Sequence, residues 1–343
     1  MRTSGDRQQK RGFMTFQEIL GNELIKDQLK TAIRTRRLQH AYLLTGDKGM
    51  GKKSMTEAFL LELFCTSPAE DGTPCLCCPS CKKILSGNHP DVIWVSHEKP
   101  ASVSVDDIRT QITDTADIRP YEGRYKVYVV PDAEKMTVQA QNALLKTLEE
   151  PPEYVIIFLL AADEKDLLDT VRSRTVKEKL KPLTDSVIRN WLRDHLRADD
   201  EKADVCVAFA RGNLGRAIEL YSSESFSEWY QRVMKIVRGI RSMSNADILI
   251  EIGKLRSECP DLMEALDLLE LWYRDLMMFM ITRDLNGLAF AGERKTLMEM
   301  ASVSSYTKVQ EIMESIETCR KRLRANVNPD LSLELLLLSM KER

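Results

Sequence analysis

A run of glycines and lysines near residue 50 has the residue types and the spacing of a phosphate-binding loop. It follows the apolar stretch Ala41–Thr45, precedes a predicted helix at Met55–Phe64, and reads Gly46-Asp47-Lys48-Gly49-Met50-Gly51-Lys52-Lys53-Ser54. A strand that leads through a glycine-rich turn into a helix directs several backbone N–H groups and the positive end of the helix dipole to one point. We therefore expect a phosphate cradle; the alternative is a tight turn that only packs a helix on a sheet. The expected members of the cradle are Gly46, Gly49, Gly51, Lys52, Lys53 and Ser54.

The loop departs from the ATPase pattern G-x-x-x-x-G-K-[ST] at one chemically important position. Gly46, Gly51 and Lys52 match the pattern, but Lys53 stands where a hydroxyl should hold Mg²⁺. Ser54, the next residue, lies about 100° further round the helix. Two unit positive charges about 4 Å apart repel by roughly 4 kcal/mol at an intermediate dielectric, so an ammonium beside the ion is unfavourable. These residues predict the shape of an ATP site without its metal chemistry.

A second departure follows the predicted strand Val127–Val130. Working P-loop ATPases end this strand in Asp-Glu, where the aspartate supports Mg²⁺ and the glutamate orients water. This chain has Pro131 and Asp132 there, unless the strand ends one residue away from where we place it. We expect no ATP and Mg²⁺ turnover by this chain, and these residues leave open whether the loop binds a nucleotide without hydrolysing it.

Five of the eight cysteines crowd between positions 65 and 81. The spacing C-x9-C-x2-C-x2-C is formed by Cys65, Cys75, Cys78 and Cys81. Four thiolates are the ligand set of a closed, structural Zn²⁺ site, so we expect one structural zinc ion. Cys77 is the surplus thiol and could replace a neighbour as a ligand. A redox role is the other interpretation, but redox C-x-x-C motifs come as a single pair in a thioredoxin-like setting.

Composition excludes several classes of protein. The 50 Lys and Arg residues are balanced by 52 Asp and Glu residues, giving a net charge of −2, so any contact with nucleic acid would need a local basic patch. We find no secretory signal and no apolar run of about 18 residues, and we expect a cytoplasmic protein without a membrane contact.

The elements that must position these residues fall into two classes along the 343-residue chain. Strands alternate with helices up to about residue 180, which predicts a parallel α/β sheet of five strands. Beyond that point only helical periodicity remains. We predict a flexible extension at 1–12, a P-loop domain at 13–180 with a zinc knuckle at 65–81, a small helical lid at 181–222 and a helical C-terminal domain at 223–343.

Several blocks along the chain resemble the AAA+ clamp loaders of bacterial DNA polymerase III. They are Leu38–Tyr42 before the glycine loop, the cysteine knuckle, Asn88–Asp91, Gln141–Pro152, Ser173-Arg174, Asn326–Asn328 and the leucine-rich end. The resemblance covers nearly the whole chain and implies that the C-terminal domain is an oligomerisation collar. The block Gln141–Pro152 resembles clamp loaders specifically, but it does not separate the delta-prime type of subunit from the ATP-hydrolysing gamma or tau type.

The departures from the pattern favour the delta-prime type. The resemblance to the gamma or tau type implies Thr or Ser at position 53, Asp-Glu after the third strand and an arginine near position 215. This chain has Lys53, Pro131-Asp132 and Gly215, with Arg216 one residue further on. The resemblance therefore implies a stator that keeps the AAA+ frame without its own ATP turnover, and the ATP-hydrolysing motor remains the alternative.

The resemblance also implies a role for Arg174, which follows Ser173. In clamp loaders a Ser-Arg-Cys motif supplies an arginine finger to the ATP site of a neighbouring subunit; here the third residue is Thr175. The other interpretation of Arg174 is a surface salt bridge. The implied direct partners are the gamma or tau ATPase and delta subunits. Through the complex, the implied partners are the sliding clamp and primed DNA. The resemblance thus implies a component of a DNA-directed DNA polymerase, which is a nucleotidyltransferase.

Overall fold

The computed structural model describes residues 15–97 and 99–341. The extension predicted at 1–12 lies outside these residues. The chain divides into two compact units, with the boundary between Leu183 and Thr184. Each unit is described by itself below.

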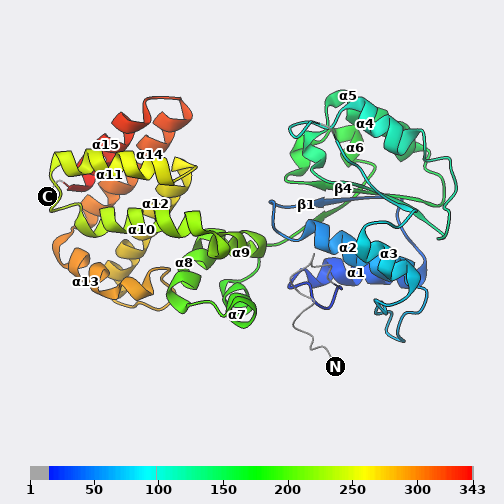
Figure 1. The fold of residues 1–343 in the computed structure, drawn as a ribbon, viewed down its shortest axis with the longest axis horizontal. Helices are drawn as coiled ribbons and strands as arrows, with labels where there is room; N and C mark the ends of the chain where they lie inside the picture. The colour runs from blue at the N-terminus through cyan, green and yellow to red at the C-terminus, as the bar shows by residue number, and fades with distance from the viewer. Residues whose placement is uncertain (1–14, 98, 342–343) are drawn as a thin grey trace. The chain divides into compact units, whose positions relative to one another are not determined.

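The first unit is built on a five-stranded parallel sheet in the order β2-β3-β4-β1-β5 (Figure 1). Its strands are β1 (Ala41–Thr45), β2 (Val92–Trp94), β3 (Lys126–Val130), β4 (Val155–Ala161) and β5 (Val176–Lys179). β1, β3 and β4 are buried along their whole length, as their continuous apolar runs predict for the centre of a parallel sheet. The predicted fold class, a parallel α/β sheet followed by helices, is confirmed.

Helices cover both faces of this sheet (Figure 1). One face carries α1 (Glu23–Thr35), α2 (Lys52–Phe64) and α3 (Pro79–Ser86). The other face carries α4 (Val105–Ile108), α5 (Val138–Glu149) and α6 (Asp169–Arg172). The short connecting elements are η2 (Arg109–Thr113), η3 (Ala133–Lys135) and η4 (Glu164–Asp166). Each face has its own hydrophobic core, one including Phe59 and Phe158 and the other Tyr128 and Leu144.

The second unit is helical. Its helices are α7 (Asp185–Leu196), α8 (Asp200–Ala210), α9 (Leu214–Ser222), α10 (Glu224–Gly239), α11 (Asn245–Glu258), α12 (Leu262–Thr282), η5 (Ala291–Glu293), α13 (Arg294–Val303), α14 (Tyr306–Arg324) and α15 (Pro329–Lys341). The stretch 271–281 of α12 is apolar nearly all round, and its Trp272, Tyr273 and Leu276 are almost completely buried. One hydrophobic cluster runs from Val205 to Met340 and therefore crosses the predicted lid boundary at 222/223. Within the described part of the chain, no helix is both long enough and apolar enough to span a bilayer.

Candidate functional site

The glycine loop joins β1 to α2 at the carboxyl end of the sheet. Gly46, Gly49 and Gly51 have φ angles of 147°, 94° and 96°, in a region that side chains with a Cβ rarely adopt. Gly51 is the residue that precedes α2, so the helix begins at Lys52, three residues earlier than the sequence indicates. The backbone thus has the strand, glycine turn and helix that a phosphate cradle requires.

Several polar groups of this loop are hydrogen-bonded within the loop. The Asp47 N–H donates to Met50 Sδ at 3.2 Å. The Lys52 ammonium donates to the carbonyl oxygens of Gly46 and Asp47, the latter at 3.2 Å. Burial lowers the pKa of Lys52, and the nearby carboxylates, led by Glu134, oppose this shift. A phosphate entering this loop would have to displace the Lys52 contacts to the loop carbonyls.

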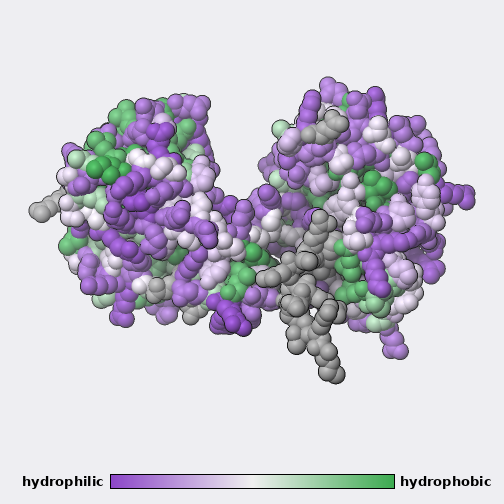
Figure 2. Space-filling view, viewed as in Figure 1, coloured by the Kyte–Doolittle hydropathy of each residue, from purple (hydrophilic) through white to green (hydrophobic). Residues whose placement is uncertain are grey.

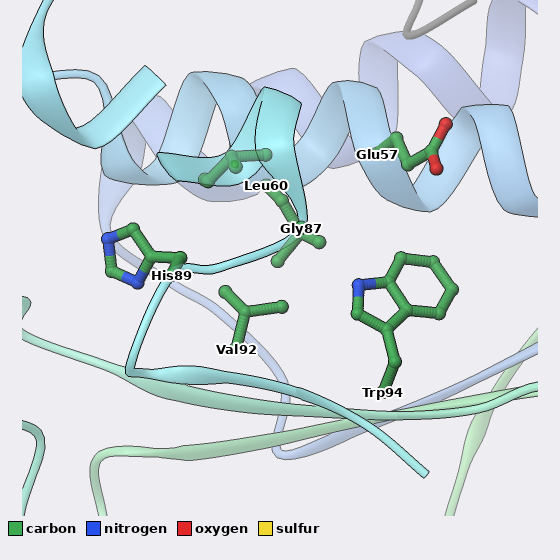
Figure 3. Close-up of a pocket in the computed structure, with 7 residues that line it drawn as sticks. Glu57, Leu60, Gly87, His89, Val92 and Trp94 are labelled. Atoms are coloured by element: carbon green, nitrogen blue, oxygen red, sulfur yellow. The ribbon is translucent and has the colours of Figure 1, made fainter. Parts of the chain in front are cut away.

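Lys53 is directed to another part of the domain. Its Nζ lies 3.8 Å from Glu57 Oε1 and 5.3 Å from the centre of the Trp94 ring. Figure 3 shows Glu57 on α2 across from Trp94 on β2, at a pocket also lined by His89. The enclosed space is about 10 Å³, roughly the volume that one water needs. Burial raises the pKa of Glu57 to about 7, although the Lys53 charge acts in the opposite direction.

The first residue after β3 is not a carboxylate. The strand ends at Val130 and is followed by Pro131 and by Asp132, whose φ is 51°. The Asp132 carboxylate forms an ion pair with Lys135 at 3.0 Å. Glu134 Oε2 is buried without a hydrogen-bond partner in the described structure. Pro131 directly follows the strand, as the sequence predicts.

A groove of about 470 Å³ borders the glycine loop, which is the size range of small-ligand sites. Gly46 and Asp47 line one side, and Lys165, Lys177 and Lys179 contribute basic groups. The Lys177 ammonium lies 3.3 Å from the carboxylate of Glu164, which also lines the groove. The sequence did not point to these lysines because they lie more than a hundred residues after the loop. The groove is therefore large enough for a small ligand beside the loop.

The four predicted metal ligands come together between α2 and α3. The sulfur atoms of Cys65, Cys75, Cys78 and Cys81 all lie within 4.8 Å of one another. Two sulfurs of a tetrahedral site with metal–sulfur bonds of about 2.3 Å are separated by about 3.8 Å, so this group can hold a metal ion. Cys77 is exposed and is not part of the group.

Backbone N–H groups donate to three of the four sulfurs of this cluster, although burial raises the pKa of Cys65 and of Cys81. Cys75 N–H donates to Cys65 Sγ at 3.3 Å, Cys78 N–H to Cys75 Sγ at 3.3 Å and Cys81 N–H to Cys78 Sγ at 3.4 Å. Burial alone would raise the pKa of Cys78, but hydrogen bonds, led by that from Thr66, lower it to about 5. A ready thiolate at the start of α3 fits a metal site, since metals bind the deprotonated sulfur.

Arg174 lies just after α6 and is partly exposed. Its Nη2 is 2.9 Å from Glu149 Oε1, at the end of α5. Its Nη1 donates to the Thr170 carbonyl oxygen at 2.9 Å and to Ser173 Oγ at 3.3 Å. The predicted finger residue is thus hydrogen-bonded through Nη1 and ion-paired through Nη2, so the salt bridge that we named as the other interpretation is present.

The chain matches two families of known proteins. Residues 21–184 match the family described as DNA polymerase III, delta subunit, and residues 227–342 match DNA polymerase III, delta subunit, C terminal. Together the two matches include most of both compact units. The chain belongs to the DNA polymerase III clamp-loader family. The predicted resemblance to bacterial clamp loaders is confirmed.

Curated relatives of this clamp-loader chain include both types of subunit. DNA polymerase III subunit delta' of Bacillus subtilis is 29% identical, over 92% of this chain and 94% of the relative. DNA polymerase III subunit tau of Bacillus subtilis is 25% identical, over 93% of this chain and 60% of the relative. Subunit tau/gamma of Haemophilus influenzae is 37% identical, but over 52% of this chain and only 25% of the relative. This chain therefore spans less than two thirds of the length of both tau-containing relatives.

Two buried polar residues of this clamp-loader chain organise the site region, and sequence reasoning had assigned a role to neither. The fully buried Asp91 carboxylate accepts hydrogen bonds from the N–H groups of Tyr121, Glu122 and Gly123. Gln141 accepts a hydrogen bond from Leu168 N–H at 2.7 Å. Both lie in blocks that carried the family resemblance, which was the available signal; their partners are 27 to 32 residues away.

Arg216 has partners within the helical unit of this clamp-loader chain. It lies next to position 215, near which the gamma or tau type is expected to have an ATP-contacting arginine. Its guanidinium forms an ion pair with Glu264 and lies 5.5 Å from the centre of the Phe209 ring. An arginine with these two contacts has a structural partner on α12 and an aromatic partner on α8. The geometry gives Arg216 a packing role in the isolated chain.

Proposed function

We propose that this chain is a delta-prime-type subunit of a clamp loader, a stator that does not hydrolyse ATP itself. The observation that carries the proposal is the pair of losses at the phosphate loop. Lys53 replaces the metal-binding hydroxyl and contacts Glu57, and Pro131 follows β3 where ATPases have an aspartate. Two independent losses from one metal site support a subunit that keeps the frame for another purpose. The alignment with delta' over nearly all of both chains also supports it.

Arg174 is the residue that would act in the reaction. In the neighbouring subunit the bond from the γ-phosphorus to the ADP oxygen breaks, a bond to water oxygen forms, and the water proton leaves. Arg174 makes no bond; its guanidinium would stabilise the negative charge on the transferring phosphoryl group. Such fingers contribute about 10³ to 10⁵ in rate in other nucleotide hydrolases. Its position after α6 and its partial exposure support this role.

The proposed partners follow from the same assignment. They are the gamma or tau ATPase and delta subunits, with the sliding clamp and primed DNA contacted through the complex. Figure 2 shows apolar side chains gathered on the helical unit over α11, α14 and α15. Large exposed hydrophobic side chains on two of these helices are Leu249, Ile250, Leu331 and Leu335. An exposed apolar surface of this kind supports a subunit contact, as expected for a collar. The ion proposed for the four-cysteine group is Zn²⁺, with a structural role.

A motor subunit of the gamma or tau type is the second candidate. The intact Gly46, Gly51 and Lys52 and the 37% identity to a tau/gamma subunit favour it. A motor subunit requires metal-dependent ATP turnover by the chain itself. The stator proposal excludes such turnover.

One ATPase experiment separates the two. The isolated chain is assayed for Mg²⁺-dependent phosphate release and for nucleotide binding, with Lys52→Ala as the control. We expect no release above background. The chain and its Arg174→Ala variant are then assembled with the ATPase subunits, delta, the clamp and primed DNA. We expect intact assembly and slower hydrolysis for the variant; turnover by the isolated chain that Lys52→Ala abolishes would establish the motor instead.

A further inference from the structure

The last turn of α5 holds the guanidinium of Arg174. Glu149 is the final residue of α5, and its carboxylate forms an ion pair with Arg174, with Oε1 2.9 Å from Nη2. On the other side, the Thr170 carbonyl accepts from Nη1 at 2.9 Å. The Arg174 side chain is 36% exposed and that of Glu149 49% exposed, so solvent and a second chain can reach both. The guanidinium is therefore oriented by two elements while part of it remains open.

The same helix is attached to the arginine segment at its other end. Gln141 is 3% exposed; its Oε1 accepts from Leu168 N–H at 2.7 Å, and its Nε2 donates to the Asp166 carbonyl at 3.4 Å. Gln141 and Glu149 are eight positions apart, which is about 12 Å along a helix. Segment 166–174 is thus bound to α5 at two separated points, which restricts both its position and its tilt.

These contacts restrict the conformational freedom of the long Arg174 side chain. An arginine has many rotamers, and a finger that reaches a second chain must be ordered before it can stabilise charge there. Contacts made within this chain provide that order before the neighbour arrives, and small displacements of a charge-stabilising group are costly to a reaction. The Glu149 carboxylate beside Nη2 and the Thr170 carbonyl bound to Nη1 contact different nitrogens of the planar guanidinium, and together they restrict its orientation.

We propose that Glu149 is a positioning residue for Arg174, which orients the guanidinium toward the ATP site of the neighbouring subunit. This inference rests on the proposed function of Arg174. Glu149 does not touch the nucleotide, makes no bond in the reaction and acts only through Arg174. The competing view is that Glu149 retains Arg174 and must release it, in which case its removal would accelerate the reaction.

The test uses the assembled clamp loader, with the ATPase sites not adjacent to this chain inactivated by alanine at their own loop lysines. Four variants of this chain are compared: Glu149→Ala, Glu149→Gln, Arg174→Ala and the double variant Glu149→Ala with Arg174→Ala. Glu150→Ala, at the exposed neighbouring position, is the matched control. Assembly and thermal unfolding of each variant are measured first, because the exposed position of Glu149 predicts that the variants fold.

We expect Glu149→Ala to lower kcat about three- to tenfold with little change in KM, since ATP binding does not involve the pair. Glu149→Gln should retain more activity, because its amide oxygen keeps an acceptor beside Nη2, and Glu150→Ala should match the unmodified chain. The double variant should be no slower than Arg174→Ala alone.

The outcomes separate the two levels of the proposal. If Arg174→Ala has no effect on turnover, the proposed function of Arg174 is wrong. If Arg174→Ala slows turnover while Glu149→Ala is as fast as the unmodified chain or faster, the finger stands and the positioning role of Glu149 is overturned.

Discussion

Neighbouring residues at the start of α2 have different environments, and this difference carries the functional argument. Lys52 donates to the loop carbonyls of Gly46 and Asp47, whereas Lys53 reaches Glu57 and Trp94. Successive residues of a helix point about 100° apart, so one lysine faces the loop and the next faces β2. The two lysines are therefore not interchangeable: Lys53, whose side chain is 69% exposed, lies 3.8 Å from the buried carboxylate of Glu57.

The acidic residues of α2 predict a pH dependence of stability. Burial raises the pKa of Glu57 and of Glu62 from 4.5 to about 7 in the folded chain. Between these pH values the folded state binds more protons than the unfolded state, so the free energy of unfolding falls as pH rises from about 4.5 to about 7. Glu57→Gln removes one of these groups and should be about 1 to 3 kcal/mol more stable than the unmodified chain at pH 8, after allowance for solvent screening.

Urea unfolding at several pH values measures this slope. The unmodified chain and Glu57→Gln should agree well below pH 4.5, where Glu57 is protonated in both the folded and the unfolded state, and should diverge as pH rises. Glu62→Gln should act in the same direction, and Glu70→Gln, at an exposed position, controls for the exchange itself. An unchanged slope in the Glu57→Gln, Glu62→Gln double variant would refute this account.

At the scale of elements, the cysteine knuckle joins the end of α2 to the start of α3. Cys65 follows α2 directly, and Cys78 precedes α3 and accepts its Cys81 N–H group. Between them lies a chain segment without helix or strand, which has little apolar surface of its own to bury. Metal binding of order 10 kcal/mol can order such a segment because the site does not exist in the unfolded chain.

This arrangement predicts that Cys81 is needed for metal binding and stability, whereas Cys77 is not. Cys81→Ser removes a fully buried sulfur of the group, and we expect loss of about one zinc ion per chain and a lower melting temperature. Cys77→Ser, at the exposed thiol, should keep both the metal and the melting temperature. Elemental analysis and thermal unfolding, with and without a chelator, make the comparison. Metal-free chain that is fully folded would count against the site.

At the scale of the whole molecule, each compact unit has hydrophobic cores of its own. The α/β unit has one core on each face of the sheet, and the helical unit has a cluster centred on α12, with Trp272 and Leu276 buried. A region with a complete core can fold alone. The division at 222/223 remains a prediction, since the cluster of the helical unit extends across it.

We therefore expect residues 184–343, expressed separately, to form a stable helical domain. Circular dichroism should show a helical spectrum and a single cooperative thermal transition. The fragment 184–343 with Trp272→Ala is the matched comparison; loss of this buried ring should lower the stability by about 3 to 5 kcal/mol. A fragment that melts without a cooperative transition would show that its core depends on the first unit.

The fold class, the family and the grouping of the cysteines could be inferred from the sequence alone. Continuous apolar runs such as Val155–Leu160 are long enough to identify buried strands, and the spacing of glycines or cysteines is local information. The predicted metal identity and the role of Arg174 stay predictions. Local patterns depend only on the periodicity and spacing within one segment. They can therefore identify single elements and motifs.

Only the tertiary structure decided which side chains meet. The approach of Lys53 to Trp94, the Asp91 carboxylate bound to the N–H groups of Tyr121 to Gly123 and the ion pair between Glu149 and Arg174 join residues 25 to 41 positions apart. Such contacts depend on the order of strands in the sheet and on how helices pack against it, and neither is encoded in periodicity. The sheet order brings α2 against β2 and α5 against α6, and these neighbours determine where each charge lies.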